Sequence, residues 1–397
     1  MKFNKTKLKN GLIILHEKRD VPVTTVMLGT RFGAIYESEK EKGIAHYIEH
    51  LCFKGTEKRN TKEIAFELEK IGGNLNAFTS EEETAYHVKL PSDYLELAMD
   101  VIFDIFFNPL FPEAEVKKEG KVICEELKMY NDNPRLHVID KLKSCLYKGS
   151  LGMGIGGTEE TVKSMNRNQL LEKHKQVYYP ENSILVVVGN NEFEDVVKFA
   201  EKFSPERTGK IQKIPKIEFQ NQKKKETRAD IQQANLTIGV HFPKTSDKDR
   251  YVAETVSAIL GGGMSSKLFT EVREKRGLAY AVKTDIDDGA EYGYLIIYVG
   301  TDKEKVDEVI ELCVKELKAL KNLKEQELVD IKKQLIGNYE VDSEDCARTA
   351  LNLILEEISG DAKDYYAYEK NINAVTLKDV KEFVSKIKDY SYYALTP

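Results

Sequence analysis

The chain repeats one pattern of strands and helices in its two halves, and this repetition limits the possible folds more than any other feature. In each half a buried strand is followed by a helix, a turn, a second strand and another helix. The matching segments are 23–33 and 236–242 for the buried strand, 103–107 and 309–317 for an apolar helix, and 183–189 and 390–395 for the closing strand. The pattern predicts an α+β fold with two homologous domains, each an antiparallel-rich β-sheet with helices packed on one face.

A polar, lysine-rich break separates the two halves. The segment 205–228 contains Pro205 and Pro215 and has the composition of a linker. A chain of 397 residues is long for one domain and suits two domains of about 200 residues. We therefore predict a first domain at 1–212 and a second at 222–397, joined through the linker region 205–228.

The first half contains the sequence His-x-x-Glu-His, formed by His46, Glu49 and His50. Composition alone would produce about 0.02 such matches in this chain. Two histidines four residues apart share one face of a helix, so both imidazoles can reach one zinc ion. Glu49 lies on the same face, and a carboxylate there can take the proton of a zinc-activated water whose pKa is about 7. The order of residues is typical of inverted zincins.

A catalytic zinc ion needs a third protein ligand and an open position for water. The segment 113–130 has a helical spacing of apolar residues and offers Glu119, Glu125 and Glu126. Glu119 and Glu126 are seven residues apart on one face, so one could bind the metal while the other holds a ligand histidine. Cys52 is a poor candidate, because its thiolate would come from the end of the same helix as the histidines.

The stretch 43–56 resembles the active-site helix of the pitrilysin and mitochondrial processing peptidase family. In that family a glutamate about 76 residues after the second histidine completes the ligand set, and this position is Glu126 here. A further family glutamate, which holds a ligand histidine, matches Glu119. The resemblance implies that Glu49 is the general base. It also implies one zinc ion (Zn2+) per chain, bound by His46, His50 and Glu126.

Two segments near the motif extend the resemblance. Residues 8–12, with an Asn-Gly turn, resemble the N-terminal strand pair of the family. Residues 72–79 look like its edge strand, which pairs with the substrate backbone. An open edge suits this task because it presents N–H and C=O groups to an extended peptide. The double glycine at 72–73 is also typical of a helix C-cap, and both interpretations can hold. The implied substrate-binding residues are Asn76, Ala77, Phe78 and Thr79.

The segment 261–280 resembles the C-terminal motif of the family, in which an arginine and a tyrosine seven residues apart reach the active site. Arg273 and Tyr280 match this spacing. The resemblance implies that they bind the substrate and stabilise the oxyanion, a task that suits a cation and a phenol. The triple glycine at 261–263 is not followed by Gly-Lys-Ser/Thr, so we do not predict nucleotide binding.

Composition narrows the class of protein further. The net charge is −6 and the charged segments are mixed in sign, which argues against a nucleic-acid binder. We find neither a signal peptide nor an apolar run of membrane-spanning length. Five cysteines without CxxC spacing indicate buried, reduced thiols and a cytoplasmic protein. We interpret the remaining histidines as structural or surface residues. They are His16, His87, His137, His174 and His241.

The leading hypothesis is a zinc-dependent endopeptidase that cleaves short unfolded peptides inside a closed chamber. Short members of the family pair as dimers, so the resemblance implies a homodimer in which Arg273 and Tyr280 complete the zinc site of the partner. A narrower alternative is the removal of leader or presequence peptides. Another alternative is a non-catalytic binding or scaffold subunit, since some relatives have lost the metal motif. Histidine and carboxylate ligands favour zinc but tolerate cobalt or manganese.

Overall fold

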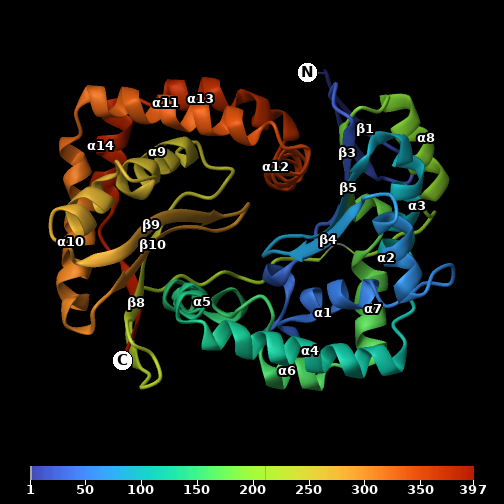
Figure 1. Cartoon of the computed structure of the whole chain (residues 1–397), viewed down its shortest axis with the longest axis horizontal. Coiled ribbons are helices and arrows are strands. Elements are labelled where there is room, and N and C mark those ends of the chain that lie inside the picture. The colour runs from blue at the N-terminus through green and yellow to red at the C-terminus, as the bar shows by residue number, and fades with distance from the viewer. Residues whose placement is uncertain (1, 211) are drawn as a thin grey trace. The chain divides into compact units, whose positions relative to one another are not determined.

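The computed structural model describes residues 2–210 and 212–397, which form two compact units, each with one β-sheet (Figure 1). The α+β class with two sheets is confirmed. The units do not follow the two halves of the chain, because each includes a segment from the other half. Unit 1 comprises residues up to 127 with 155–216 and 342–365, and unit 2 comprises 128–154, 217–341 and 366–397. The division into domains at 1–212 and 222–397, joined through 205–228, stays a prediction.

Unit 1 contains a six-stranded sheet with the order β1-β2-β6-β3-β5-β4. Its strands are β1 (Lys2–Lys7), β2 (Ile13–Lys18), β3 (Val23–Thr30), β4 (Asn74–Thr79), β5 (Thr84–Pro91) and β6 (Ser183–Gly189). The central strand β3 is antiparallel to both of its neighbours, with Met27 opposite His87 on β5 and Val186 on β6. β2 runs parallel to β6. The predicted edge strand at 72–79 is β4, which ends the sheet.

Unit 2 repeats this pairing in a five-stranded sheet with the order β7-β11-β8-β10-β9. Its strands are β7 (Lys223–Thr227), β8 (Ala234–His241), β9 (Ala279–Asp288), β10 (Gly293–Thr301) and β11 (Ser391–Thr396). β8 is antiparallel to β10 and β11, and β7 runs parallel to β11. These relations match those of β3, β5, β6 and β2, so the duplication inferred from the sequence is visible in the strand topology.

Helices cover one face of each sheet with residues from the same half of the chain. Those of the first half are α1 (Ile44–Cys52), α2 (Thr61–Glu69), α3 (Leu95–Phe107), α4 (Glu113–Asp132), α6 (Glu159–Ser164), α7 (Arg167–Val177) and α8 (Phe193–Phe203). Those of the second half are α9 (Arg250–Gly261), α10 (Val306–Ala319), α11 (Glu325–Asp342), α13 (Tyr368–Ala374) and α14 (Leu377–Lys386). The helix α3 is apolar on most sides and forms the centre of the core of unit 1 with β3 and β5.

The opposite face of each sheet is covered by one helix from the other half of the chain. α12 (Cys346–Ser359) packs on β3 and β6, although it lies late in the sequence (Figure 1). α5 (Pro134–Leu146) packs in the same way on β8 and β11. Both helices come close to the strands at a glycine. A Cβ on Gly29 would lie 2.6 Å from Ile354, and one on Gly239 would lie 2.8 Å from Leu146. The prediction that helices pack on one face of each sheet therefore holds only for the helices that come from the same half of the chain as that sheet.

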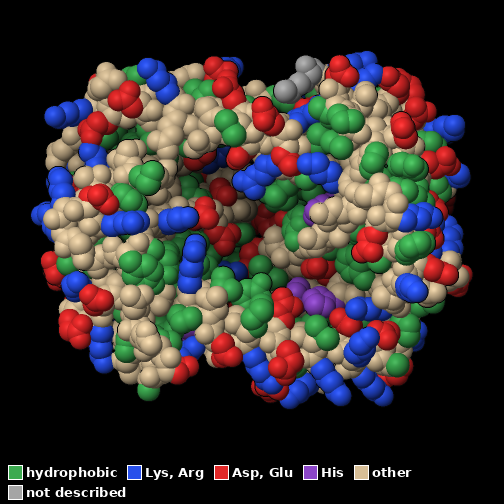
Figure 2. All heavy atoms as spheres, viewed as in Figure 1, with side chains coloured by type: hydrophobic (Ala, Val, Ile, Leu, Met, Phe, Trp, Pro, Cys, Tyr) green, Lys and Arg blue, Asp and Glu red, His purple; other side chains and the backbone are tan. Residues whose placement is uncertain are grey.

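Three further sequence-based expectations can be compared with this fold. All five cysteines are buried. Acidic and basic side chains are interspersed on the face of the molecule shown in Figure 2, without a continuous basic surface. Among the described residues, none of the helices has both the length and the apolar character that are needed to cross a bilayer.

Candidate metal site and general base

The helix α1 is held at its first turn by a buried carboxylate. Glu37 accepts hydrogen bonds from the backbone N–H groups of Gly43, at 2.9 Å, and Ala45, at 2.8 Å. Gly43 has φ +95°, a conformation that glycine adopts readily. Burial raises the pKa of Glu37 to about 7, although Lys42 at 3.7 Å and the two N–H groups oppose the shift. This arrangement fixes the start of the helix directly before His46.

The motif residues and the core residues lie on different faces of the helix α1. Its apolar side chains are buried in unit 1, whereas His46, Glu49 and His50 are only partly buried and share the other face. This is the arrangement predicted from the i, i+3 and i+4 spacing. The buried residues of α1 are Ile44, Ala45, Tyr47, Ile48, Leu51 and Cys52.

Glu126 on α4 lies opposite the two histidines. Its Oε2 atom is 3.8 Å from Nε2 of His46 and 3.5 Å from Nε2 of His50. Two ligands of one tetrahedral zinc ion are separated by about 3.3 Å when each bond is about 2.05 Å. One ligand atom from each of the three residues falls within 4.8 Å of the others, and no second group of this kind occurs in the described part of the chain. The donor set and its spacing fit a zinc ion.

The distance between α1 and α4 is set by a tyrosine and a glycine. The hydroxyl of Tyr47 donates a hydrogen bond of 2.6 Å to the carbonyl oxygen of Val116. A Cβ on Gly120 would lie 2.5 Å from the same hydroxyl, so only glycine allows this contact. The position of Glu126, less than two turns further along α4, depends on this close approach of the helices.

Glu119 and Lys54 hold the second histidine. Oε2 of Glu119 is 3.3 Å from Nδ1 of His50, and its Oε1 is 2.9 Å from the ammonium group of Lys54. Glu119 is 3% exposed, so the lysine balances a buried carboxylate. A proton on Nδ1 that is donated to Glu119 leaves Nε2 of His50 free to bind a metal. The sequence predicted that Glu119 would hold a ligand histidine. It did not predict the contact of Lys54 with Glu119, because the spacing between these two residues matches no recognisable pattern.

The electrostatics of the site favour a neutral His46 and an ionised Glu126. Burial alone would lower the pKa of His50, but its hydrogen bonds to Glu126 and Glu119 outweigh this effect and raise the pKa. Burial, and then the neighbouring His50, lower the pKa of His46 to about 4, so its imidazole is neutral at pH 7. A hydrogen bond from His50, together with both imidazoles, lowers the pKa of Glu126 against the opposing effect of burial. A neutral imidazole and an ionised carboxylate are the forms that coordinate zinc. By contrast Glu125, the neighbour of Glu126, is exposed.

Glu49 is half-buried and contacts the edge strand. The hydroxyl of Thr79, the last residue of β4, donates a hydrogen bond of 2.6 Å to Oε2 of Glu49. Burial raises the pKa of Glu49, and the hydrogen bond from Thr79 opposes this shift. The sequence analysis placed Thr79 among the substrate-binding residues and missed this contact. Nothing in the spacing indicates it, because the two residues are 30 positions apart on different elements.

The strand β4 has an uncharged outer edge. It pairs with β5 only, and the other side of β4 has no strand partner among the described residues. The three remaining edge strands, β1, β7 and β9, all carry charged side chains, whereas β4 has none. Charged residues commonly protect an edge from unwanted pairing. Among the four residues predicted to bind substrate, Asn76 is exposed and Ala77, Phe78 and Thr79 are half-buried.

Arg273 and Tyr280 belong to unit 2. Arg273 lies in the short helix η6 (Phe269–Glu274), and its guanidinium group lies over the ring of Phe269 at 4.8 Å. Tyr280 is the second residue of β9 and is 47% exposed, with its ring close to the backbone of Gly300. The participation of Arg273 and Tyr280 in the zinc site stays a prediction.

The remaining histidines have other contacts. Three of them, His16, His174 and His241, have Nε2 within 2.9–3.0 Å of a backbone carbonyl oxygen. His137 pairs with Glu226 at 2.8 Å. Neither these four nor His87 joins a group of three ligand side chains within the described residues.

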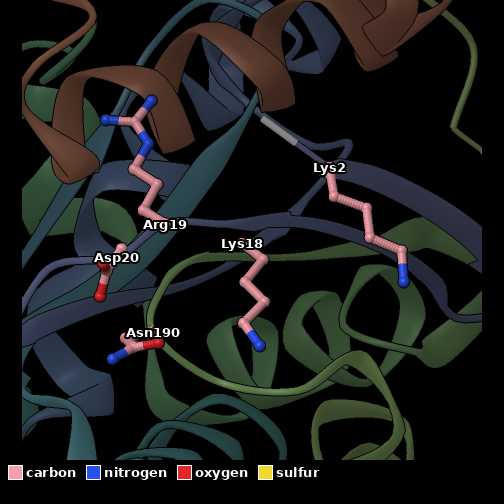
Figure 3. A pocket seen from close by; sticks show the side chains of 5 residues that line it. All are labelled: Lys2, Lys18, Arg19, Asp20 and Asn190. Atoms are coloured by element: carbon pink, nitrogen blue, oxygen red, sulfur yellow. The ribbon is translucent and has the colours of Figure 1, made fainter.

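A pocket elsewhere in unit 1 is lined by charged residues but does not contain any of the candidate ligands (Figure 3). Two of its three cations have partners, since Lys18 pairs with Glu192 and Arg19 pairs with Glu17 at 2.7 Å, and the lining also includes the carboxylate of Asp20. The pocket therefore does not indicate a site for an anionic ligand. Its lining residues are Lys2, Lys18, Arg19, Asp20 and Asn190.

Comparison with protein families gives two matches. The family model described as insulinase (peptidase family M16) matches residues 12–159, and the model of the peptidase M16 inactive domain matches 164–335. A protein of Bacillus subtilis (strain 168), named uncharacterized zinc protease YmxG, is 34% identical, and the alignment covers 98% of this chain and 97% of that protein. An uncharacterized zinc protease of Rickettsia bellii (strain RML369-C) is 33% identical, with coverages of 97% and 92%.

Two solved structures have the same fold. A protease from Helicobacter pylori superimposes with a TM-score of 0.91 at 21% identity, covering all of this chain and 99% of that one. A structure titled peptidase M16 inactive domain, from Pseudomonas fluorescens, superimposes with a TM-score of 0.91 at 19% identity, with coverages of 100% and 98%. At these identities the likeness supports the fold alone.

Proposed function

The chain belongs to peptidase family M16, and we propose that it is a zinc metalloendopeptidase that cleaves short unfolded peptides. One observation carries this proposal. The ligand atoms of His46, His50 and Glu126 lie within 4.8 Å of one another, and Glu49 occupies the same helix face as the two histidines. A metal site with an adjacent carboxylate is the arrangement that metal-assisted hydrolysis needs.

The proposed ligands of one zinc ion per chain are His46, His50 and Glu126. When bound, the ion would supply a Lewis acid for the scissile carbonyl and a water of lowered pKa. Glu119 and Lys54 fix the ring of His50, so that Nε2 faces the ligand position. Removal of these partners is expected to weaken metal binding without unfolding the chain.

Glu49 is the proposed general base and, later, the general acid. It takes a proton from the water that attacks the scissile carbonyl carbon, and it returns this proton to the amine nitrogen as the C–N bond breaks. The half-buried position of the carboxylate supports this role, because burial raises its pKa and makes it a better proton acceptor at neutral pH.

The peptide would be held as an additional strand on the outer edge of β4. Its backbone would pair with 76–79, so binding would depend weakly on substrate side chains. The uncharged edge of β4 supports this proposal, as does its contact with α1, which carries Glu49. The same docking mode would serve leader or presequence peptides, which form a narrower substrate class of the same reaction.

We also propose a two-fold homodimer with a closed chamber, in which Arg273 and Tyr280 act at the zinc site of the partner subunit. A mixing experiment tests this assignment. Glu49→Gln and Arg273→Ala chains, each inactive alone, would form mixed dimers with one complete site. Random mixing should then restore about a quarter of the wild-type activity. If both groups act within one subunit, no mixture regains activity.

The test of the proposed function compares the zinc-loaded wild type with Glu49→Gln on a mixed library of unstructured peptides, with products identified by mass spectrometry. Glu125→Gln, on the exposed face of α4, is the matched control. We expect cleavage by the wild type and the control, and a loss of about 10²–10⁴-fold for Glu49→Gln at unchanged zinc content. Cleavage by Glu49→Gln at the wild-type rate would refute the base assignment. Stoichiometric zinc with no cleavage by any variant would instead indicate a non-catalytic binding subunit.

A further inference from the structure

We infer that Thr79 is the positioning residue of Glu49, so that the strand proposed to dock the peptide also orients the general base. This inference deepens the proposed function and rests on it. It assigns to Thr79 a task that its side chain performs, which is separate from the backbone pairing proposed for β4. Thr79 does not act on the reacting atoms and works only through Glu49.

The contact between the two side chains is short and has a defined direction. An ionised carboxylate has no proton, so the hydroxyl of Thr79 must donate the hydrogen bond of 2.6 Å to Oε2 of Glu49. This length is typical of an O–H···O⁻ bond, which is stronger than a neutral one. The bond engages one of the two carboxylate oxygens and thereby fixes the plane of the carboxylate, so the second oxygen can serve in proton transfer.

The orientation of Thr79 follows from the alternation of side chains along β4. Leu75 and Ala77 pack against the core of unit 1, and Thr79 is on the same side of the strand because side chains two residues apart share a face. Phe78 lies on the opposite side, where the centroid of its ring is 6.4 Å from that of the His87 ring. The hydroxyl of Thr79 is therefore directed toward α1, which contacts β4.

Thr79 is itself fixed at the closed end of the hairpin formed by β4 and β5. It is paired with Thr84, and the two hydroxyl oxygens are 3.4 Å apart. Thr84 is fully buried and donates its own proton to the carbonyl oxygen of Phe32 at 2.9 Å. The turn between the strands is closed by a backbone hydrogen bond of 2.8 Å from Ser80 to Glu83. A strand end that is held in this way provides a rigid support for the general base.

The experiment uses the full-length, zinc-loaded protein and three substitutions. Thr79→Val has nearly the same shape and lacks the hydroxyl, whereas Thr79→Ser keeps the hydroxyl. Thr25→Val is the matched control, because Thr25 is a buried strand residue whose hydroxyl has no hydrogen-bond partner among the described residues. We measure kcat and KM on a peptide cleaved by the wild type, and zinc content by metal analysis.

We expect Thr79→Val to lower kcat by about 10- to 100-fold, because a small misplacement of a catalytic group has an effect of this size. KM should stay within about twofold of the wild type, and zinc content should not change. Thr79→Ser should recover kcat to within about threefold, and Thr25→Val should behave as the wild type. Wild-type kinetics for Thr79→Val, a change in KM alone, or failure of Thr79→Ser to recover kcat would each overturn the inference.

A double substitution separates positioning from an independent effect. In the Glu49→Gln background, Thr79→Val should reduce the remaining activity by less than about threefold, since residues that act as a unit are not additive. A further tenfold loss would show that Thr79 acts without Glu49 and would overturn the inference. If Thr79→Val does not fold, Thr79→Ala replaces it with the same expectation. A wild type that cleaves no peptide would refute the proposed function, which is a different outcome from a Thr79→Val enzyme with unchanged rates.

Discussion

Lys54, Glu119 and His50 form a chain of polar contacts that ends at the candidate metal position. Each contact constrains the next, since the lysine balances the charge of a buried carboxylate and the carboxylate orients the imidazole. The metal affinity of this site should therefore depend on residues that do not touch the ion.

Glu119→Gln should weaken zinc binding by about 10- to 100-fold, because the ring of His50 loses its charged hydrogen-bond partner. The dissociation constant can be measured by competition with a zinc-binding dye. Glu113→Gln is the control, since Glu113 is on the same helix and pairs with Lys117 at the exposed surface. An unchanged affinity for Glu119→Gln would contradict the assigned role.

Glu226 is the centre of a second polar cluster, in unit 2. Burial alone would raise the pKa of this carboxyl, but hydrogen bonds from Tyr393, His137 and Arg228 outweigh it and lower the pKa to about 2. A carboxyl whose folded-state pKa lies below its unfolded value of 4.5 adds stability above pH 4.5. This contribution is lost as the pH falls from 4.5 through about 2.

Glu226→Gln should therefore lower the free energy of unfolding at pH 7 by about 1–2 kcal/mol, a value reduced for the partial exposure of the group. The difference between wild type and variant should shrink as the pH falls through 4.5 toward 2. Urea unfolding at pH 7, 5 and 3 measures it. A difference that is constant over this range would show that the charge of Glu226 does not contribute.

At the scale of elements, the pair α1 and α4 sets the geometry of the metal site. The hydroxyl of Tyr47 is in contact with both Val116 and Gly120, so α4 cannot accept a side chain at residue 120 without moving. Because Glu126 follows on the same helix, a shift of α4 changes its distance from the histidines.

Gly120→Ala should destabilise the fold by about 1–3 kcal/mol through overpacking and should also weaken zinc binding. Adding Tyr47→Phe, which removes the obstructing hydroxyl, should recover part of both losses. Gly337→Ala is the control, because Gly337 is also in a helix but has open space around it. That substitution should stabilise the fold by about 0.5–1 kcal/mol. The prediction fails if Gly120→Ala binds zinc as tightly as the wild type.

The sequence was sufficient to predict elements whose pattern is local. The strands β3, β6, β8 and β11 and the helices α3 and α4 lie where the apolar periodicity and turn residues indicated, and β4 lies where the family resemblance implied an edge strand. Similarly, the i, i+4 spacing placed His46 and His50 together. Contacts between distant segments were not predictable, because no periodicity links Thr79 with Glu49, Lys54 with Glu119, or α12 with the first sheet.

At the scale of the whole molecule, the two compact units share segments of both halves of the chain. The second face of the first sheet includes Met27, Val186 and Val188, which alternate with the core residues of their strands and are nearly inaccessible to solvent. α12 covers this face with apolar residues such as Leu353 and Ile354. The first half of the chain alone therefore lacks α12, which is part of unit 1.

A fragment of residues 1–212 should not fold cooperatively, because removal of α12 leaves this apolar face exposed. Thermal unfolding followed by circular dichroism should show a broad transition, and the fragment should bind the dye ANS. Producing 1–212 together with 213–397 should restore a sharp transition. The control is the complete chain cut at a protease site inserted after Lys216, which keeps all segments and should stay folded. A sharp, dye-free transition for the fragment alone would contradict this prediction.

The position of α12 also determines the order in which the protein can form during synthesis. The last strand of the first sheet ends at Gly189, but the helix that covers its second face ends at Ser359. At about 5–20 residues per second, the ribosome needs roughly ten to thirty seconds to translate the interval. During that time the nascent sheet has an uncovered apolar surface, so the domain that begins the chain is completed almost last. We therefore expect newly made chains to depend on chaperones that bind exposed strands until translation is nearly finished.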